Sequence, residues 1–406
     1  MATHRLYYDD SYLQNFQARV VVCLPVEPVA TPAGTRPAWE VLLDRTAFYP
    51  SSGGQPHDLG RLGEARILDV RDAGEDVAHI VDAELSPGPV EACVDWGRRF
   101  DHMQQHTGQH LLSAMFQERF GLSTVSFHLG SDVCTIDLRG PEPSADALRG
   151  AQRAANEIVF GDRPVNVRYG TSDQLAQQGV RKEVEREGIL RAIEIEAADL
   201  QPCGGTHVKS TGQIGLILIR RCSKIRQDWR VEFACGGRAE RIASDDFQLL
   251  RALAERLSCA PNELPAVLEK YADERDANFK SLQFALQLLA ESWAKTLVSD
   301  APAAQDGSRV VAMLLRPEHP GGLLLPLATE LARSERTVAL LIHEATGQLV
   351  FAQSPGAGKD LPEILKQVLA TMPGKGGGTR DFVRAKLADP MHSAAALELA
   401  KHVAGR

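Results

Sequence analysis

Two pairs of metal-binding side chains constrain this chain more than any other feature. His106 and His110 stand four residues apart in a predicted helix from Asp101 to Phe120, and Cys203 and His207 stand four apart in a glycine-rich segment. Residues i and i+4 share one face of a helix, so the two imidazoles point the same way. Three histidines and a cysteine form a ligand set that suits Zn²⁺. The sequence therefore predicts a fold that joins both pairs in one zinc site.

Neither pair alone would indicate a metal. An isolated HxxxH is more often two ordinary helical histidines, and one Cys with one His makes a poor site. Gly204 and Gly205 lie between the second pair and allow the chain to fold tightly, so that both ligands can face one ion. His102, four residues before His106, is an alternative ligand or an outer partner of the site.

Composition limits the classes of protein that remain. The 406 residues are 44% apolar and 24% charged, which predicts two to four globular domains. A net charge of -8 gives no global basic field, so nucleic acid would have to be bound by local patches. The seven scattered cysteines are no disulfide framework. The polar N-terminus and the lack of a bilayer-length apolar run predict a soluble, cytoplasmic protein with no membrane partner.

The pattern of apolar residues predicts an α+β fold in four parts. Short runs of β-formers, bounded by Gly, Pro and Asp, predict a small β-barrel over residues 1–97. Mixed helices and strands surround the ligand pairs in a zinc-binding domain, 98–238. Residues 239–300 predict a helical hairpin, because apolar residues recur there at three- and four-residue steps. Alternating strands and helices predict a small α/β domain over 308–406.

The helical hairpin has two interpretations. It is either a spacer that packs on its neighbours or a coiled coil that joins two copies in a homodimer. Too few heptads are present to establish the coiled coil.

The residues around the ligand pairs resemble a known family. HTGQHLL, followed much later by CGGTHVKSTGQIG, resembles the editing domain of alanyl-tRNA synthetases and of their free-standing relatives, the AlaX-type proteins. The stretch from Phe48 to Gly60 resembles the glycine-rich segment of the N-terminal part of AlaX proteins, and Ser126 to Leu138 resembles the strand region after their zinc-binding helix. PGKGGG, from Pro373 to Gly378, resembles a glycine-rich loop of the C-terminal domain of the synthetases, the DHHA1 type.

The resemblance covers nearly the whole chain, and its most specific part is the combination of the two ligand pairs. No segment that could form an aminoacylation domain precedes the predicted barrel, and no DHH triplet of the related phosphoesterases is present. The chain is therefore expected to be the long form of AlaX, which edits without synthesis.

This resemblance implies hydrolysis of the ester that joins a wrong amino acid to the 3′ end of tRNA(Ala). The expected substrate is Ser-tRNA(Ala), and Gly-tRNA(Ala) stays open. A pocket shaped for alanine discriminates by only about 10- to 200-fold against amino acids that differ by one small group, so a second hydrolytic sieve is needed. Zinc could activate a water or could organise the pocket, and the sequence leaves both roles open.

A sieve for serine needs a polar partner for the serine hydroxyl, because that partner stays unpaired when alanine enters. His128 stands where the full-length synthetases carry glutamine, which leaves the preference for serine over glycine open. The segment SSGGQP could alternatively be a tight surface turn. We predict catalytic roles for Thr107, Gln109 and His128, and substrate binding by Ser51, Ser52, Gly53, Gly54 and Gln55.

Two local groups of residues could bind tRNA despite the negative net charge. The first follows the CGGTH segment, where basic side chains could contact the phosphates of the CCA end or could form a solvated strand edge. The second is in PGKGGG, whose glycines could expose backbone N–H groups to an anion or could form a plain loop. The residues concerned are Arg220, Arg221, Lys224, Arg226 and Arg230, then Lys375, Gly376, Gly377 and Gly378.

Two other functions compete with trans-editing of tRNA(Ala). The chain could be a non-catalytic tRNA-binding module that kept a structural zinc, or a deacylase for another misacylated tRNA. The intact zinc ligands and SGGQP favour an enzyme, because a binding module needs no shaped amino-acid pocket. A change of substrate would be expected at Ser52 and His128.

Overall fold

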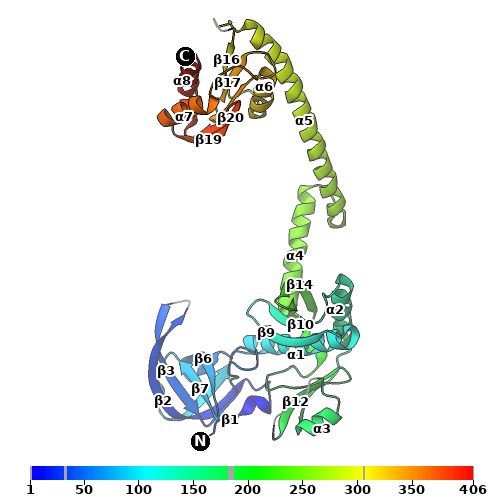
Figure 1. The fold of residues 1–406 in the computed structure, drawn as a ribbon. Coiled ribbons are helices and arrows are strands. Elements are labelled where there is room, and N and C mark those ends of the chain that lie inside the picture. Colours follow the sequence, from blue (N-terminus) through cyan, green and yellow to red (C-terminus); the bar gives the residue numbers. More distant parts are fainter. Residues whose placement is uncertain (1, 32–33, 182–186, 305–306, 406) are drawn as a thin grey trace. The chain divides into compact units, whose positions relative to one another are not determined.

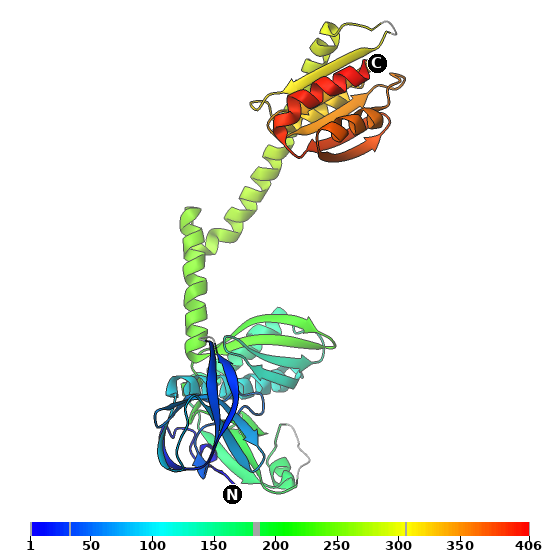
Figure 2. The same ribbon diagram turned by 90° about the vertical axis from the view of Figure 1, so that its left-hand side faces the viewer.

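The computed structural model describes residues 2–31, 34–181, 187–304 and 307–405. It divides into two compact units, Met1–Ala252 and Leu253–Arg406, and each is described here by itself. Figures 1 and 2 draw the ribbon from two sides. Helices and strands are mixed in both units, which confirms the α+β prediction. Among the described residues, no helix combines the length and apolar character needed to cross a membrane.

The N-terminal part of the first unit is a six-stranded sheet that closes on itself. Its strands hydrogen-bond in the ring order β2-β3-β7-β6-β5-β8. Fully buried side chains such as Val41, Leu62 and Val70 fill its interior. The short strands β1 (His4–Arg5) and β4 (Arg45–Thr46) pair beside it. The ring consists of β2 (Asn15–Thr31), β3 (Gly34–Leu43), β5 (Gly60–Leu62), β6 (Ala65–Ala73), β7 (Asp76–Val81) and β8 (Gly88–Val94).

Helix α1 (Trp96–Phe120) follows directly and is the central element of the first unit. Its N-cap, Asp95, accepts a hydrogen bond from the backbone N–H of Arg98, and the helix ends at Gly121, whose φ of 66° suits glycine. The helix starts at Trp96, five residues earlier than predicted, because its N-cap is Asp95. Nearly all side chains from His102 to Phe116 are buried.

Two sheets flank α1. An antiparallel sheet in the order β14-β15-β10-β9 packs with α1 and α2 (Ala145–Phe160) around Met103, Phe116, Ile136 and Phe233. The three-stranded sheet β11-β12-β13 ends at Pro202 and so delivers the Cys203 segment to the face of α1. These strands are β9 (Ser123–Leu129), β10 (Cys134–Arg139), β11 (Val165–Gly170), β12 (Leu190–Ile195), β13 (Asp199–Pro202), β14 (Ile217–Ile225) and β15 (Asp228–Cys235), with α3 (Ser172–Gln177) after β11 and α4 (Gly236–Arg256) last.

The second unit contains a five-stranded sheet in the order β16-β17-β18-β20-β19. Residues of the inner strand β17 alternate between two cores, one beneath α7 and α8 and one beneath α5 and α6. Since both faces are covered, every residue of β17 is buried. The elements are α5 (Leu264–Asp300), β16 (Arg309–Leu315), α6 (Leu324–Leu331), β17 (Thr337–His343), β18 (Gln348–Gln353), α7 (Leu361–Thr371), β19 (Gly374–Thr379), β20 (Phe382–Leu387) and α8 (Ser393–Ala404).

The structure corrects one local prediction. The PGKGGG segment is an edge strand, β19, that pairs antiparallel with β20, and not a loop. A Cβ at Gly376 would lie 2.3 Å from the carbonyl oxygen of Arg384, and one at Gly378 would lie 2.1 Å from that of Phe382. These glycines are therefore required for the close approach of the two strands.

The four predicted domains and the helical hairpin stay predictions. Both predicted helices are present, as α4 and α5. However, nearly all of α4 belongs to the first unit and all of α5 to the second. The two interpretations of this region, a spacer and a dimer contact, also stay predictions.

Candidate metal centre and substrate pocket

The fold brings the two ligand pairs together. One ligand atom from each of His106, His110, Cys203 and His207 lies within 4.8 Å of all the others. The Sγ of Cys203 is 3.5 Å from Nε2 of His106 and 3.3 Å from Nε2 of His207. All three imidazoles are buried. Four nitrogen and sulfur donors at this spacing could hold one metal ion.

Each imidazole is oriented by a second hydrogen bond at its other nitrogen. Nδ1 of His106 is 2.8 Å from Oε1 of Gln55, and Nδ1 of His207 is 3.1 Å from Oγ1 of Thr107. Nδ1 of His110 is 3.2 Å from a carboxylate oxygen of Asp199. Each of these oxygens can accept a hydrogen bond from Nδ1–H, which leaves Nε2 of His106 and His207 facing the Sγ of Cys203. Outer partners of this kind are typical of histidines that bind a metal.

The electrostatics of the cluster suit a thiolate ligand. Burial raises the pKa of Cys203, but the adjacent His106 and His207 outweigh burial, and the pKa lies well below its usual value. Burial and His106 lower the pKa of His207 to about 3, so this imidazole is neutral. Burial lowers the pKa of His110, but Asp199 and Cys203 outweigh it and raise the pKa to about 9. Metal binding at His110 must therefore release a proton.

The cluster depends on close packing around the glycines. A Cβ at Gly205 would lie 2.2 Å from Cε1 of His106 and 2.9 Å from Oε1 of Gln55, so only glycine fits. Gln55 also accepts a hydrogen bond from the backbone N–H of Thr206 and donates one to its hydroxyl. The glycine-rich segment after β4 thus fixes both the loop that carries Cys203 and the ring of His106.

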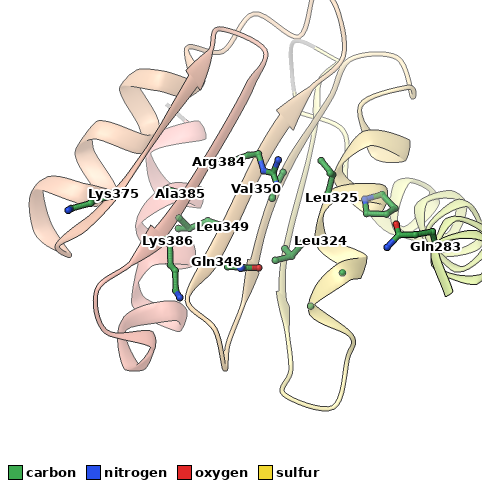
Figure 3. A pocket seen from close by; sticks show the side chains of 13 residues that line it. Gln283, Leu324, Leu325, Gln348, Leu349, Val350, Lys375, Arg384, Ala385 and Lys386 are labelled. Carbon is green, nitrogen blue, oxygen red and sulfur yellow. The ribbon is translucent and has the colours of Figure 1, made fainter. Parts of the chain in front are cut away.

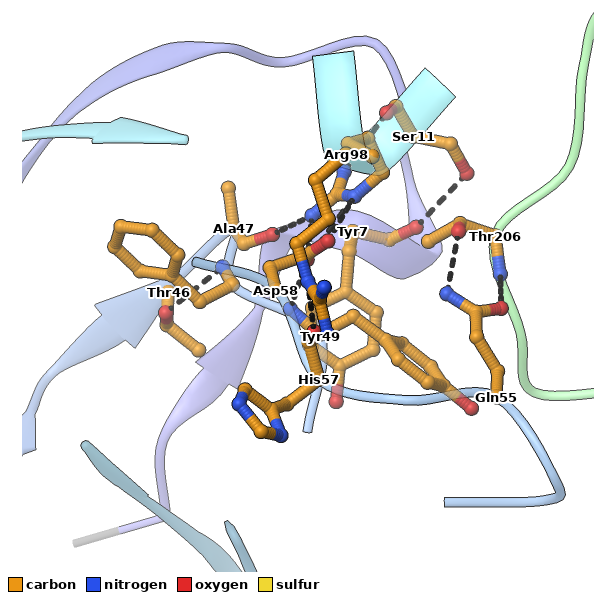
Figure 4. A network of polar contacts seen from close by, with 12 residues as sticks. Tyr7, Ser11, Thr46, Ala47, Tyr49, Gln55, His57, Asp58, Arg98 and Thr206 are labelled. Atoms are coloured by element: carbon orange, nitrogen blue, oxygen red, sulfur yellow. Dashed lines mark hydrogen bonds and ion pairs between the residues drawn. The ribbon is translucent and has the colours of Figure 1, made fainter. Parts of the chain in front are cut away.

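A fully buried ion pair between Arg99 and Asp58 anchors this glycine-rich segment, and Figure 4 shows Asp58 within the surrounding polar contacts. Arg99, in the first turn of α1, binds both carboxylate oxygens of Asp58 and donates to the carbonyl oxygens of Ser11 and Ala47. Asp58 also accepts a hydrogen bond of 2.6 Å from the backbone N–H of Tyr49. The pair connects α1 to the chain before β2 and to the segment between β4 and β5, and so supports the position of Gln55.

A pocket of about 440 Å³ opens beside the ligand cluster. Three of the four ligands line it, together with Gln109 from the same helix and Arg181. Phe127 on β9 forms another wall, and Gly54, with φ of 81°, packs under its ring, where a Cβ would lie 2.7 Å away. Such a volume fits a small-molecule site. The rest of the lining is Gly53, Thr124, Val125, Ser126, Gln201 and Pro202.

The structure separates the predicted pocket residues into three groups. Gly53, Gly54 and Gln109 line the pocket. Gln55 and Thr107 lie behind the ligands and contact His106 and His207. Ser51, Ser52 and His128 are exposed and do not belong to the lining. His128 directly follows Phe127 on β9. Successive side chains of a strand point to opposite faces, so the side chain of His128 lies on the other face of the strand.

Asp199 and Arg181 belong to the site but were not predicted from the sequence. Asp199 is shared between His110 and Arg181, whose Nε lies 2.7 Å from the second carboxylate oxygen. Neither residue is part of a ligand motif, and Arg181 lies on an irregular segment. Only the position of Asp199 in the strand before Cys203 could have suggested it.

The basic residues predicted after the CGGTH segment lie on β14, β15 and the turn between them. Arg220 forms an ion pair with Asp246, and Arg230 binds Asp137 at 2.8 and 2.9 Å. These two guanidinium groups are therefore already engaged. Lys224 lies 5.8 Å above the ring of Trp229. The side chains of Arg221 and Arg226 are exposed.

The second unit contains a separate basic pocket of about 490 Å³ (Figure 3). Its cations are Lys375, Arg384 and Lys386, and no acidic residue is among its lining. Lys375 and Lys386 lie directly opposite on neighbouring strands. Like charges in that position repel each other, so a bound anion would stabilise them.

The contact between Thr107 and His207 makes a testable prediction. The hydroxyl of Thr107 donates a hydrogen bond to the carbonyl oxygen of Met103. Its Oγ1 can therefore accept hydrogen bonds from His207 and from the backbone N–H of Val208. Thr107→Val would leave both donors unpaired, so metal affinity should fall about 10- to 100-fold. Competition with a chromogenic chelator measures the metal affinity. Thr107→Ser keeps the oxygen and should bind metal as the wild type does; equal affinity for all three proteins would contradict this role.

Comparison with known proteins identifies the class to which this fold and site belong. Residues 190–230, which include β12, β13 and the Cys203 segment, match the family model described as Threonyl and Alanyl tRNA synthetase second additional domain. The alanyl-tRNA editing protein AlaX-L of Pyrococcus horikoshii is 30% identical over 398 residues, which are 94% of each chain. The alanyl-tRNA editing protein Aarsd1 of Rattus norvegicus is 30% identical over 386 residues, 93% of this chain and 92% of its own.

A full-length synthetase matches as well. The alanine–tRNA ligase of Pyrococcus abyssi is 28% identical over 426 residues, which cover 98% of this chain but 43% of the ligase. Together, these matches define a protein related to part of the alanyl-tRNA synthetases. The chain belongs to the family of alanyl-tRNA editing proteins.

Proposed function

We propose that this protein hydrolyses the ester between a wrong amino acid and the 3′ end of tRNA(Ala), and that serine is its principal target. The observation that carries this proposal is the pocket of about 440 Å³ whose wall includes three of the four clustered ligands. A ligand that enters this pocket lies beside the cluster. The editing proteins to which the chain is related have the same extent, since AlaX-L is covered over 94% of its length.

Zinc is the proposed ion, because the donor set of three imidazoles and one thiolate suits it. His106, His110, Cys203 and His207 would hold it. When bound, zinc would supply a positive charge that polarises an ester carbonyl or lowers the pKa of a water. Four protein ligands favour an organising role, unless one ligand is displaced when substrate binds.

The chain's own residues would orient the substrate and exclude water. Phe127 and Gly54 close one side of the pocket with apolar atoms. Arg181 contributes a guanidinium to the lining, and Asp199 fixes it in place. A partly buried cation at this position would attract the phosphate of the terminal nucleotide. Gln55, Thr107 and Asp199 would hold the ligands through the reaction rather than touch the substrate.

We also propose that the basic pocket of the second unit contacts tRNA phosphates. The double substitution Arg384→Ala/Lys386→Ala should weaken binding of tRNA regardless of the attached amino acid. The slope of log affinity against log salt should fall by about 1 for each phosphate that the variant no longer neutralises. Filter binding at a series of salt concentrations measures both.

A matched control removes the same charge elsewhere in the second unit. Lys366 and Lys401 lie on α7 and α8 and form ion pairs with Glu363 and Glu398. The double substitution Lys366→Ala/Lys401→Ala should leave the salt slope unchanged. Equal slopes for the wild type and the Arg384/Lys386 variant would remove this surface from the proposal.

The function itself is tested by a panel of esters. Serine, glycine and alanine attached to tRNA(Ala) are each incubated with the protein, and released amino acid is measured. The proposal predicts rapid release of serine and slow release of alanine. A protein that holds metal and binds tRNA but releases none of the three amino acids would instead be a binding module.

A further inference from the structure

A polar atom in the wall of the pocket lacks a hydrogen-bond partner. Oε1 of Gln109 is buried and meets no donor among the described residues, while Gln109 lines the pocket beside His106, His110 and Cys203. Its side chain is also almost fully enclosed, with 3% exposure. Since roughly 90% or more of buried polar groups are paired, this acceptor indicates that a ligand supplies the missing donor.

The amide of Gln109 is fixed in this orientation by its other end. Its Nε2 donates to Oγ of Ser113 at 2.9 Å, one helical turn further along α1. The same oxygen also accepts a hydrogen bond of 2.8 Å from the hydroxyl of Thr124 on β9. Ser113 is fully buried. Because the nitrogen end is held there, the oxygen end is left for the pocket.

Two other polar residues beside the ligands already have their acceptor oxygens engaged. Oε1 of Gln55 already accepts from His106 and from the backbone of Thr206. Thr107 is engaged by its own helix and by His207. The three remaining sequence candidates lie outside the lining, namely Ser51, Ser52 and His128.

We propose that Gln109 determines specificity by accepting a hydrogen bond from the hydroxyl of a β-hydroxy amino acid in the ester substrate. The inference rests on the proposed function and names the group that this pocket reads. An alanyl ester has a methyl group with no donor, so it would desolvate Oε1 without pairing it. That difference corresponds to roughly 10- to 100-fold in favour of serine.

The substitution Gln109→Leu tests this role. It keeps much of the side-chain volume but removes the acceptor. The kcat/KM for the seryl ester should fall about 10- to 100-fold, whereas that for the alanyl ester should stay constant or rise. Gln109→Glu retains an acceptor oxygen and should retain the preference for serine. Gln117→Leu makes the same exchange on the same helix outside the pocket and should change neither rate.

Two further readouts separate this inference from the proposed function and from a structural role. Binding of seryl and alanyl adenosine analogues with a 3′-amide link is measured by calorimetry, and metal content is measured for every variant. A wild type that prefers the seryl analogue but cleaves no ester would end the proposed function and leave the inference standing. If Gln109→Leu loses its metal, weakens both analogues equally, or keeps the wild-type ratio, Gln109 does not read the hydroxyl.

Discussion

Cys203→Ala is expected to abolish metal binding and deacylation together. The thiolate is the only anionic donor of the cluster, and it lies within 3.5 Å of two imidazole nitrogens. Its loss leaves three neutral ligands at most. Removing an outer partner alone typically costs 10- to 100-fold in affinity, so removing this ligand should cost more than about 100-fold. Metal content after dialysis and serine release from Ser-tRNA(Ala) are measured on the same preparation.

Cys93→Ala is the matched control for this experiment. Its thiol is exposed on β8 and belongs neither to the ligand cluster nor to the lining of the adjacent pocket, so the substitution should change neither metal content nor activity. If Cys203→Ala lost its metal but kept wild-type serine release, the cluster would have no part in the reaction. If it kept its metal as well, the four-ligand assignment itself would be wrong.

Arg99→Met is expected to cause the largest loss of stability. The substitution leaves the carboxylate of Asp58 fully buried without its cation. Breaking a buried ion pair in this way typically costs about 3 to 5 kcal/mol, because the remaining charge is uncompensated. The glycine-rich segment should also loosen, so metal affinity should fall with stability. The full chain is unfolded in urea, and unfolding is monitored by hydrogen exchange in α1. Exchange in this helix reports on the first unit alone.

The control for this prediction is Arg119→Met, which removes an exposed guanidinium from the last turn of the same helix. It should leave exchange in α1 near the wild-type rate. Equal protection of α1 in both variants would show that the Arg99–Asp58 pair supports neither the fold nor Gln55.

The three outer partners come from separate parts of the first unit. Gln55 lies between β4 and β5, Thr107 lies on α1, and Asp199 begins β13. The three histidines are therefore oriented only after all these parts have assembled. Metal binding should be coupled to folding of the first unit for this reason.

The ligand set could be predicted from the sequence because helical periodicity and glycine content act locally. HTGQH has to present both histidines on one face of α1, and CGGTH has to turn tightly. The outer partners could not be predicted, because Asp199 and Gln55 reach the histidines only through the tertiary packing of β13 and the glycine-rich segment. For the same reason, the alternation of β9 implies that Phe127 and His128 face opposite ways but not which of them faces the pocket.

The second unit shows a different limit on what can be predicted from the sequence. The loop predicted for PGKGGG rests on its resemblance to a glycine-rich loop of the synthetases, and glycine is unfavourable in strands. Its glycines are needed instead where the backbones of β19 and β20 approach closely, which only the pairing with β20 reveals. The anion-binding hypothesis therefore moves from the glycine backbone to the basic side chains of the pocket in Figure 3.

The most direct test of the central claim is a single-turnover measurement of serine release from Ser-tRNA(Ala) as metal-free protein is titrated with Zn²⁺. The account predicts that the rate rises linearly and reaches its plateau at one zinc per chain, with little release from Ala-tRNA(Ala) throughout. Full activity in the metal-free protein, or no release of serine at one bound zinc per chain, would contradict it.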